Sequence, residues 1–409
     1  MITPQTINYE DKPLSGLRVV DFSRVLAGPY CSMCLGDMGA DVVKIERIDG
    51  GDDTRRFGPP FLEGISTYFM SLNRNKRSIA LDLKNPKSHE VVQRLLKSAD
   101  IVLENFRPGT MEKLGFDRES CWSVNPRLIY CSISAFGHRG DPEWSRKPGY
   151  DLILQGMGGI PSITGEPDGA PSKVGASIAD VVSGMNAFSG ILLALLARSK
   201  TDRGQHVDIS MQEGQLSLHT YLASAWLNAG VEPPRNGNRH LSIAPYSTYE
   251  AADGWLNIAI ANEKLWGIFC KALGTEDWLS DARFSGNAER VANIDALDQL
   301  INARLAHHNV AHWIGVLQDA GIPAGPVFSI RQALEHPQVN ARNTIVAGSM
   351  RQGPAFKTVD SAFGIRTRTP RSDVSAPALG EHTLEILREC AFAEDEIKSL
   401  LQDAAAQTT

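Results

Sequence analysis

The stretch LRVVDFSRVLAGPYCSMCLGDMGADVVKIE, residues 17–46, decides the fold. Residues 17–22 form a short apolar run typical of a buried strand, and residues 28–40 follow a helical pattern that stops at Gly39. Residues 41–46 form a second buried strand. Strand, helix and strand in succession predict a βαβ unit, whose strands are parallel and joined by a right-handed crossover.

The same alternation continues along the first half of the chain. Further strands are expected at 78–83, 100–106 and 127–137, with an amphipathic helix at 86–99. This pattern predicts an α/β fold built on an open, mostly parallel sheet. The turn after the first strand lacks the glycines of a dinucleotide-binding fingerprint, although Glu46 stands where a ribose-binding acid would lie, so an NAD site is not expected.

The character of the chain changes after residue 205. A strand at 206–211 and a long helix at 211–230 precede a boundary rich in Pro, Gly and Asn. Two strands and three helices then predict a smaller α/β module. The expected organisation is a large domain at 1–205, a linker at 206–235, a small domain at 236–325, and at 326–409 a return linker with the C-terminal part of the large domain.

Composition points to an ordinary globular protein. Hydrophobic residues make up 42% and charged residues 22%, and the net charge of −6 gives no reason to expect nucleic acid or a membrane as partner. The first twelve residues lack the features of a targeting segment, so a cytoplasmic location is expected. The run ILLALLA at 191–197 is shorter than the roughly 20 residues of a membrane span and is predicted to be a buried helix.

No metal site is predicted. Cys31 and Cys34 form a CxxC pair that would suit redox chemistry or a metal, but Met33 and Leu35 indicate the interior of a helix. The histidines show no recognised ligand spacing, because His307 and His308 are adjacent and cannot share a helix face.

Basic residues gather just after predicted strands or between a strand and a helix. In an open parallel sheet the carboxyl ends of the strands line the ligand crevice, so these side chains are expected to converge there. Such a cluster suits a phosphate-rich ligand, although a solvated charged rim explains it equally well. The residues are Arg47, Arg74, Lys76, Arg107 and Lys113.

A lone carboxylate, Asp180, precedes the apolar run MNAFSGILLALLARSK at 185–200. Asp is a preferred helix N-cap, and this is the simpler interpretation of its position. A carboxylate at a helix N-terminus also stays ionised and can attack an activated carbonyl. Small neighbours such as Gly175, Ala176 and Gly184 would let a substrate approach.

Six motifs together resemble the class III CoA-transferases, also called the formyl-CoA or carnitine CoA-transferase family. They occur in family order and span roughly residues 14–390. The resemblance implies a Rossmann-like large domain built from both chain ends, a smaller α/β domain between, and two subunits interlocked as a homodimer. The motifs are residues 17–47, 66–83, 99–115, 149–159, 178–195 and 379–387.

The resemblance also implies residue roles. The family's nucleophilic aspartate falls on Asp180, which would carry an acyl-aspartyl anhydride and then an aspartyl-CoA thioester. Coenzyme A enters as the acyl-CoA co-substrate, and no metal is needed. The implied CoA-binding residues are Leu26, Ala27, Arg47, Asn73, Arg74, Asn75, Lys76, Asn105, Phe106, Arg107 and Lys113.

Two departures narrow the implied activity. NGNRHLSIAPY at 236–246 stands where formyl-CoA transferases carry a glycine-rich loop, which argues against formyl or oxalyl specificity. Tyr150 stands where the racemase branch has a histidine, and tyrosine is a poor acid/base group because its pKa is about 10. A transferase is therefore expected; the alternatives are a 2-methylacyl-CoA racemase, a transferase for a different carboxylic acid, or a non-catalytic CoA-binding protein.

The motifs look closest to the succinyl-CoA–glutarate type of dicarboxylate CoA-transferase. A dicarboxylate needs a cation for its distal carboxylate. Arg24, Arg74 and His240 are the candidates for that group, and Tyr150 is expected to contact substrate.

Overall fold

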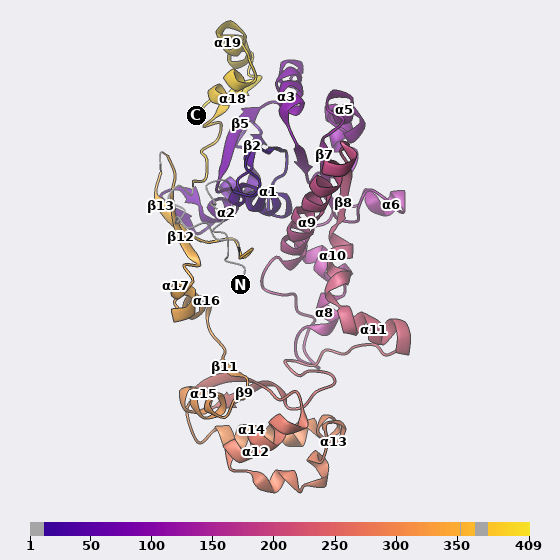
Figure 1. Cartoon of the computed structure of the whole chain (residues 1–409), viewed down its shortest axis with the longest axis vertical. Helices are drawn as coiled ribbons and strands as arrows, with labels where there is room; N and C mark the ends of the chain where they lie inside the picture. Colours follow the sequence, from indigo (N-terminus) through magenta and orange to yellow (C-terminus); the bar gives the residue numbers. More distant parts are fainter. Residues whose placement is uncertain (1–11, 352, 365–374) are drawn as a thin grey trace, which may run out of the picture. The chain divides into compact units, whose positions relative to one another are not determined.

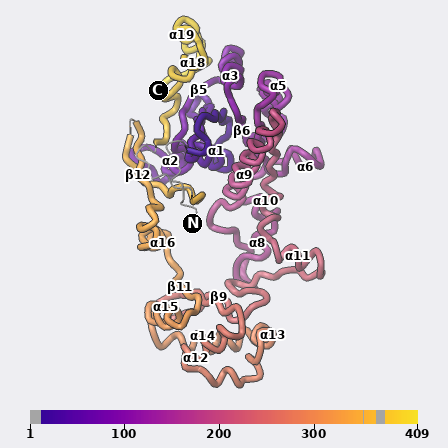
Figure 2. Tube along the Cα trace, viewed as in Figure 1, coloured from indigo at the N-terminus to yellow at the C-terminus, as the bar shows by residue number. Residues whose placement is uncertain are grey.

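The computed structural model describes residues 12–351, 353–364 and 375–409, which divide into two compact units. The large unit comprises the chain up to Gly159, Val174–Ala223 and the chain from Asn343 onward. The small unit comprises Ile160–Lys173 and Ser224–Arg342. Figures 1 and 2 trace both units along the chain.

A seven-stranded sheet forms the centre of the large unit (Figure 1), in the order β14-β5-β2-β1-β6-β7-β8. All neighbours are parallel except β14, which pairs antiparallel with β5. The sheet confirms the predicted α/β class. The strands are β1 (Arg18–Asp21), β2 (Asp41–Glu46), β5 (Lys76–Leu81), β6 (Ile101–Glu104), β7 (Ile129–Ser134), β8 (His206–Ser210) and β14 (Ala406–Gln407).

Helices cover both faces of this sheet. The core on one face is built from α1, α7, α9 and α10. The core on the other face is built from α3, α4, α5, α18 and α19, so the end of the chain returns to cover the sheet that its beginning forms. The helices are α1 (Ala27–Asp37), α3 (Pro86–Ser98), α4 (Thr110–Leu114), α5 (Arg118–Val124), α7 (Asp151–Met157), α9 (Ile178–Thr201), α10 (Met211–Leu218), α18 (Thr383–Glu389) and α19 (Glu394–Gln402).

Shorter elements complete the large unit. Two hairpins, β3–β4 and β12–β13, lie outside the main sheet. The loops after β2 and β7 carry short helical turns. These elements are η1 (Asp53–Arg56), β3 (Phe61–Leu62), β4 (Ile65–Ser66), α2 (Thr67–Leu72), α6 (Pro142–Ser145), β12 (Ile345–Ser349) and β13 (Ala355–Val359).

The small unit has its own core around a three-stranded antiparallel sheet, in the order β11-β10-β9. The two strands predicted for this unit match β9 (Tyr246–Ala251) and β10 (Gly254–Ala259). The other elements are α8 (Ile160–Ile163), α12 (Glu263–Leu273), α13 (Asn287–Ala292), α14 (Ile294–Leu305), α15 (Val310–Asp319), β11 (Ala324–Pro326), α16 (Ile330–Leu334) and α17 (Pro337–Ala341).

The long helix predicted at 211–230 is divided into α10 and α11 (Thr220–Ala229). Thr220 has a positive φ of 36°, which a β-branched residue rarely adopts and which interrupts the helix. The sequence has no Gly or Pro at the break. The helical pattern of apolar residues therefore predicted one continuous helix.

Helix α9 is not fully buried, and the prediction of a buried helix was wrong for one of its faces. Ala187 and Ile191 pack on the sheet, whereas Leu193 and Leu196 are 67% and 59% exposed. By length and composition, α9 is the described helix that could cross a membrane, with 39% of its most apolar window buried. Its exposed face needs a separate explanation.

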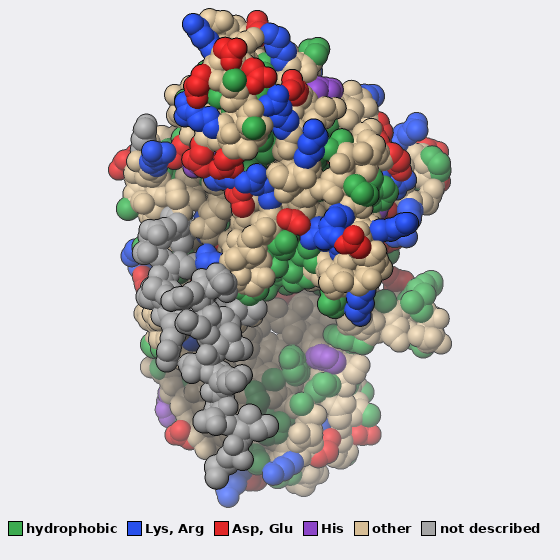
Figure 3. All heavy atoms as spheres, turned by 45° about the horizontal axis from the view of Figure 1, so that its top comes forward, with side chains coloured by type: hydrophobic (Ala, Val, Ile, Leu, Met, Phe, Trp, Pro, Cys, Tyr) green, Lys and Arg blue, Asp and Glu red, His purple; other side chains and the backbone are tan. Residues whose placement is uncertain are grey.

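An ion-pair network ties the C-terminal helix α18 to the sheet. The Arg77 guanidinium at β5 donates to the carboxylates of Asp41, Glu385 and Glu389 at 2.6–2.9 Å. Arg18 on β1 donates to Asp41 and Glu389 as well. Side chains of both charges crowd the surface at the top of Figure 3, where the C-terminal helices lie. The network fixes the end of the chain against its beginning.

Replacing Arg77 with Ala should lower the free energy of unfolding by about 2 kcal/mol or more, because several charged acceptors lose their donor together. The measurement is the midpoint of urea unfolding followed by circular dichroism. Arg388→Ala, which removes an exposed pair with Glu394, is the control and should leave the midpoint nearly unchanged. Equal midpoints for the two variants would contradict the role of Arg77.

Candidate active site

A buried ion network lies at the carboxyl ends of β1 and β2. The Lys44 ammonium is 2.9 Å from the Asp52 carboxylate and donates to the Ser23 carbonyl at 2.8 Å. Asp21 accepts from the Ser23 amide at 2.9 Å and lies 3.5 Å from the Lys76 ammonium. Burial lowers the pKa of Lys76 to about 8, an effect that the Asp21 carboxylate partly offsets. These bonds hold the loops that follow both strands.

The stretch 73–76, expected to bind CoA, lies at the amino end of β5, and its polar groups are bonded to the protein. Arg74 is 2% exposed and donates twice to the Asp37 carboxylate, at 3.0 and 2.7 Å. Asn75 also donates to Asp37, and the Lys76 ammonium donates to the Asn73 side chain at 3.0 Å. The structure therefore supports a scaffolding role for this stretch, and Arg74 is not available to a distal carboxylate.

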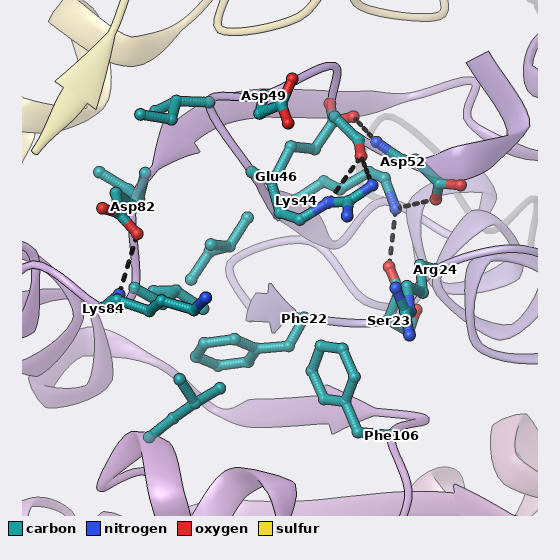
Figure 4. Close-up of a pocket in the computed structure, with 17 residues that line it drawn as sticks. Phe22, Ser23, Arg24, Lys44, Glu46, Asp49, Asp52, Asp82, Lys84 and Phe106 are labelled. Atoms are coloured by element: carbon teal, nitrogen blue, oxygen red, sulfur yellow. Dashed lines mark hydrogen bonds and ion pairs between the residues drawn. The ribbon is translucent and has the colours of Figure 1, made fainter. Parts of the chain in front are cut away.

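A cavity of about 480 Å³ opens beside the network (Figure 4). The Phe22 and Phe106 rings lie along one side of it, and Arg24, Lys44 and Glu46 lie across from them in the close-up. The Arg24 guanidinium carbon is 5.5 Å from the centre of the Phe106 ring. Aromatic faces beside cations suit a flat, phosphorylated ligand.

Arg47 and Lys84 add positive charge to this cavity. Arg47 is held by Asp53 at 2.8 Å and by the Gly51 carbonyl. Lys84 is exposed, and its ammonium has no bonded partner in the described part of the chain. Leu26 and Lys113, which were also expected to bind CoA, do not line the cavities described for this unit.

Asp180 lines a neighbouring cavity of about 380 Å³. Arg24 and Phe106 line both cavities, so the two share a wall. The structure thus brings Asp180 together with part of the predicted ligand-binding set. The predicted residues around this cavity are Arg24, Ala27, Asn105, Phe106, Arg107 and Tyr150.

The loop after β1 is clamped to the loop after β6. The Asn105 side chain accepts from the Arg24 amide at 2.9 Å and donates to the Arg24 carbonyl at 2.8 Å. Val25 follows with a φ of 67°, strained for a β-branched residue, and its amide donates to Asp52. Strained backbone residues are frequent at ligand-binding sites. Val25 also lines the Asp180 cavity.

Asp180 is not an N-cap, and that interpretation was wrong. Helix α9 begins at Ile178 after Ser177, which places Asp180 in the first turn. The cap is supplied by Asp151 of α7, whose carboxylate accepts from the Ala179 amide at 2.9 Å. Gln155 then bonds Asp151 at 2.8 Å and holds the segment before the helix. In the described part of the chain, the Asp180 carboxylate has no bonded partner.

Burial, and then the nearby Asp151 carboxylate, raise the pKa of Asp180 from an ordinary 3.8 to about 7. The α9 helix dipole favours the anion by only about 0.3–1 kcal/mol, so desolvation prevails. Near neutral pH, Asp180 is therefore partly ionised and more basic than a surface carboxylate. A shifted, unpaired carboxyl in a cavity is a candidate nucleophile.

Gly184 allows α9 to lie close to α1. A Cβ at Gly184 would stand 2.6 Å from the Ala27 carbonyl oxygen, nearer than a side chain can approach. This close packing places the first turn of α9 beside the loop after β1.

Sequence reasoning missed three residues of the site. Asp151 is adjacent to Tyr150 but was not predicted. It lies on α7 and caps α9, and the sequence around Asp151 carries no sign of that contact. Burial and then Asp180 raise the pKa of Tyr68 to about 12, which places that phenol near the nucleophile. Lys84 follows a strand, as the predicted cations do, and that pattern would have found it.

The two remaining substrate candidates lie in different units. Tyr150 is 71% exposed and lines the Asp180 cavity. His240 belongs to the small unit, where its ring lies 5.4 Å from that of Tyr246 and accepts from the Ser242 amide.

The site combines an unpaired carboxyl, in the described part of the chain, with a cationic, aromatic ligand cavity. The model for CoA-transferase family III matches residues 14–383, and the chain belongs to that family and is a CoA-transferase. It is 40% identical to a succinate–glutarate CoA-transferase of Agrobacterium fabrum, over 93% of this chain and 96% of the relative. It is 37% identical to the mouse succinyl-CoA:glutarate CoA-transferase, over 97% and 91%. A CAIB/BAIF family protein from Brucella suis has the same fold, with a TM-score of 0.82, 38% identity and coverage of 93% and 100%.

Replacing Asp151 with Asn should lower the pKa of Asp180, because a neighbouring negative charge is lost while a carbonyl remains to cap Ala179. Only the ionised carboxylate attacks, so kcat/KM of the parent should fall as pH drops through about 7. In the variant this acid limb should move to lower pH.

The measurement is kcat/KM for an acyl-CoA between pH 5 and 9. Asp141→Asn, which changes the exposed N-cap of α6, is the control and should leave the limb in place. An unmoved limb in Asp151→Asn would show that Asp151 does not set the titration.

Proposed function

We propose that this protein transfers CoA from succinyl-CoA to a dicarboxylate through covalent intermediates on Asp180. The observation that carries the proposal is the unpaired carboxyl of Asp180 in a cavity that shares a wall with a larger cationic, aromatic cavity. The succinate–glutarate relatives support the choice of donor and acceptor.

CoA would span both cavities. Its adenine and phosphates suit the larger cavity, where Phe22 and Phe106 offer apolar faces and Arg47 and Lys84 offer positive charge. The pantetheine arm would pass the shared wall at Arg24 and Phe106 and carry the thioester to Asp180. This path uses a subset of the CoA-binding residues expected from the sequence.

The first half of the reaction releases the donor acid. An Asp180 oxygen attacks the thioester carbonyl, and the tetrahedral intermediate collapses by expelling CoA thiolate, which leaves an acyl-aspartyl anhydride. The thiolate then attacks the aspartyl carbonyl and expels the donor carboxylate. Asp180 now carries CoA as a thioester, and no proton has been consumed.

The second half runs the same steps in reverse with the acceptor. Its carboxylate attacks the aspartyl thioester, forming a new anhydride and thiolate. The thiolate attacks the acceptor's acyl carbon, which gives the new acyl-CoA and frees Asp180. Arg24 and Arg107 line the Asp180 cavity and supply guanidiniums for the distal carboxylate of a dicarboxylic acid.

A homodimer is part of the proposal. Helices α7, α9 and α10 pack on one another and each exposes apolar side chains, among them Leu152, Leu193 and Leu216 at 59%, 67% and 53%. A contiguous apolar surface of this kind marks a protein interface. The occupant we propose is a second copy of this chain, interlocked with the first as the family resemblance implies.

The double variant Leu193→Glu and Leu196→Glu, refolded from denaturant, should yield more monomer than the refolded parent, because charge would replace apolar contact while the interface forms. Light scattering after size exclusion measures the mass. Val327→Glu alters an apolar side chain that is 53% exposed in the small unit and serves as comparison. A parent protein that elutes as a monomer would contradict the dimer.

Asp180→Asn should abolish transfer, since an amide cannot form the anhydride, while CoA binding persists. The parent, incubated with succinyl-CoA and each C3–C6 dicarboxylate, should form the acceptor's CoA ester. It should also yield an acyl-enzyme that hydroxylamine captures on Asp180.

Calorimetry with CoA shows whether the variant still binds. Asp141→Asn is the matched carboxyl-to-amide control and should keep full activity. Full transfer by Asp180→Asn would refute the nucleophile. Solvent deuterium at the α-carbon of a 2-methylacyl-CoA, without transfer, would identify a racemase instead.

A further inference from the structure

A third cavity, of about 450 Å³ and with a polar lining, lies in the large unit, and apart from Arg107 its residues have no part in the proposed reaction. It is lined from the end of β6, the starts of β7 and β8, helices α4 and α5, and the α6 loop. Arg107 and Pro108 are the residues it shares with the Asp180 cavity.

The floor of this cavity holds a buried acid and two histidines. Glu104 is 1% exposed, and one of its oxygens accepts from the Phe106 amide at 2.8 Å. Its other oxygen stands 3.7 Å from His138 Nε2, too far for a direct hydrogen bond. His138 Nε2 is buried and unpartnered in the described part of the chain. Two polar atoms 3.7 Å apart can both hydrogen-bond a single polar group that approaches them from the cavity.

The second histidine, His206, is already committed. Its Nδ1 lies 3.2 Å from the Arg118 guanidinium, which can only donate, so Nδ1 accepts. Its Nε2 therefore carries the proton and donates to the Ser132 hydroxyl at 2.7 Å. Both nitrogens of His206 are satisfied, which leaves Glu104 and His138 as the open polar pair of the floor.

The floor is close to neutral in charge. Burial raises the pKa of Glu104 to about 8, although its hydrogen bond from Phe106 opposes the effect, so this carboxyl is mostly protonated near pH 7. Burial also lowers the pKa of His138. The floor thus offers hydrogen-bonding groups without a full charge.

The mouth of the cavity carries unpaired positive charge. Arg107 and Arg146 are exposed, and in the described part of the chain neither guanidinium has a bonded partner. Of the carboxylates there, Asp117 caps α5 and Glu119 accepts from Arg118, which leaves Glu112 unpaired. With Glu104 protonated, the lining carries as many cationic as anionic side chains, and Arg107 and Arg146 are the cations left open to an anionic group.

We propose that this cavity is a binding site for a small organic acid that also bears a hydroxyl or second carboxyl group. A carboxylate would bind Arg107 and Arg146 at the mouth, and the polar end group would bridge Glu104 and His138 on the floor. Inorganic phosphate could satisfy the guanidiniums but has no carbon chain that carries a second polar group to the floor. Arg107 also lines the Asp180 cavity. An acid bound in this third cavity would therefore occupy an arginine that the Asp180 cavity also uses.

The test follows His138 directly. Protein labelled with ¹³C at histidine Cε1 is saturated with CoA and titrated with malate, and the His138 signal is assigned by its loss in His138→Gln. The signal should shift saturably. In Arg146→Ala the half-saturating malate concentration should rise about tenfold, the loss of roughly one charged contact.

Arg127→Ala, which removes an exposed arginine paired with Asp202 outside the cavity, is the matched control and should titrate like the parent. Phosphate at equal ionic strength should move the His138 signal little. An unmoved signal with malate, an equal response to phosphate, or an Arg146→Ala titration like the parent's would overturn the proposal. None of these readouts depends on CoA transfer, so they separate this site from the proposed reaction.

Discussion

The buried ion network at the ends of β1 and β2 is the constraint on which the site depends. Lys44 and Asp52 are each 1% exposed at their side chains, and isolated charges at that depth would be costly. They persist because each is paired and because their bonds to Ser23 and Val25 fix the loop that forms the wall of both ligand cavities. The network fixes the positions of the site loops but contributes little to the free energy of unfolding.

Asp180, the proposed nucleophile, depends on a different balance, between its position and its pKa. Asp151 caps α9 and so fixes the position of the Asp180 turn, but its charge also raises the pKa of Asp180. A neutral cap would position the helix as well and leave a weaker base. One carboxylate thus orients the helix and tunes the group that this helix carries, which couples the local fold to reactivity.

The sequence allowed the sheet to be predicted, because its strands carry a local signal. Asp180 was singled out as a nucleophile only through the family resemblance, since its local signal favoured an N-cap. The strand expected at 41–46 is β2 itself, since a strand buried on both faces reads as one apolar run. The roles of Arg74 and Lys76 could not be predicted, because a basic residue after a turn looks the same whether it meets a ligand or Asp37. The cap by Asp151 joins residues that are distant in the chain, and no periodicity reports such a contact.

The wall shared by the two cavities restricts what the site can accept. Arg24 and Phe106 face both cavities, and Asn105 clamps the backbone of Arg24, so this wall is held in place. A ligand that lies in the larger cavity and reaches Asp180 must pass this wall. A nucleotide joined to a thin, flexible thiol arm suits that path, with the nucleotide in the larger cavity and the thiol end beside Asp180. This division of the site agrees with the CoA esters that the proposed reaction requires.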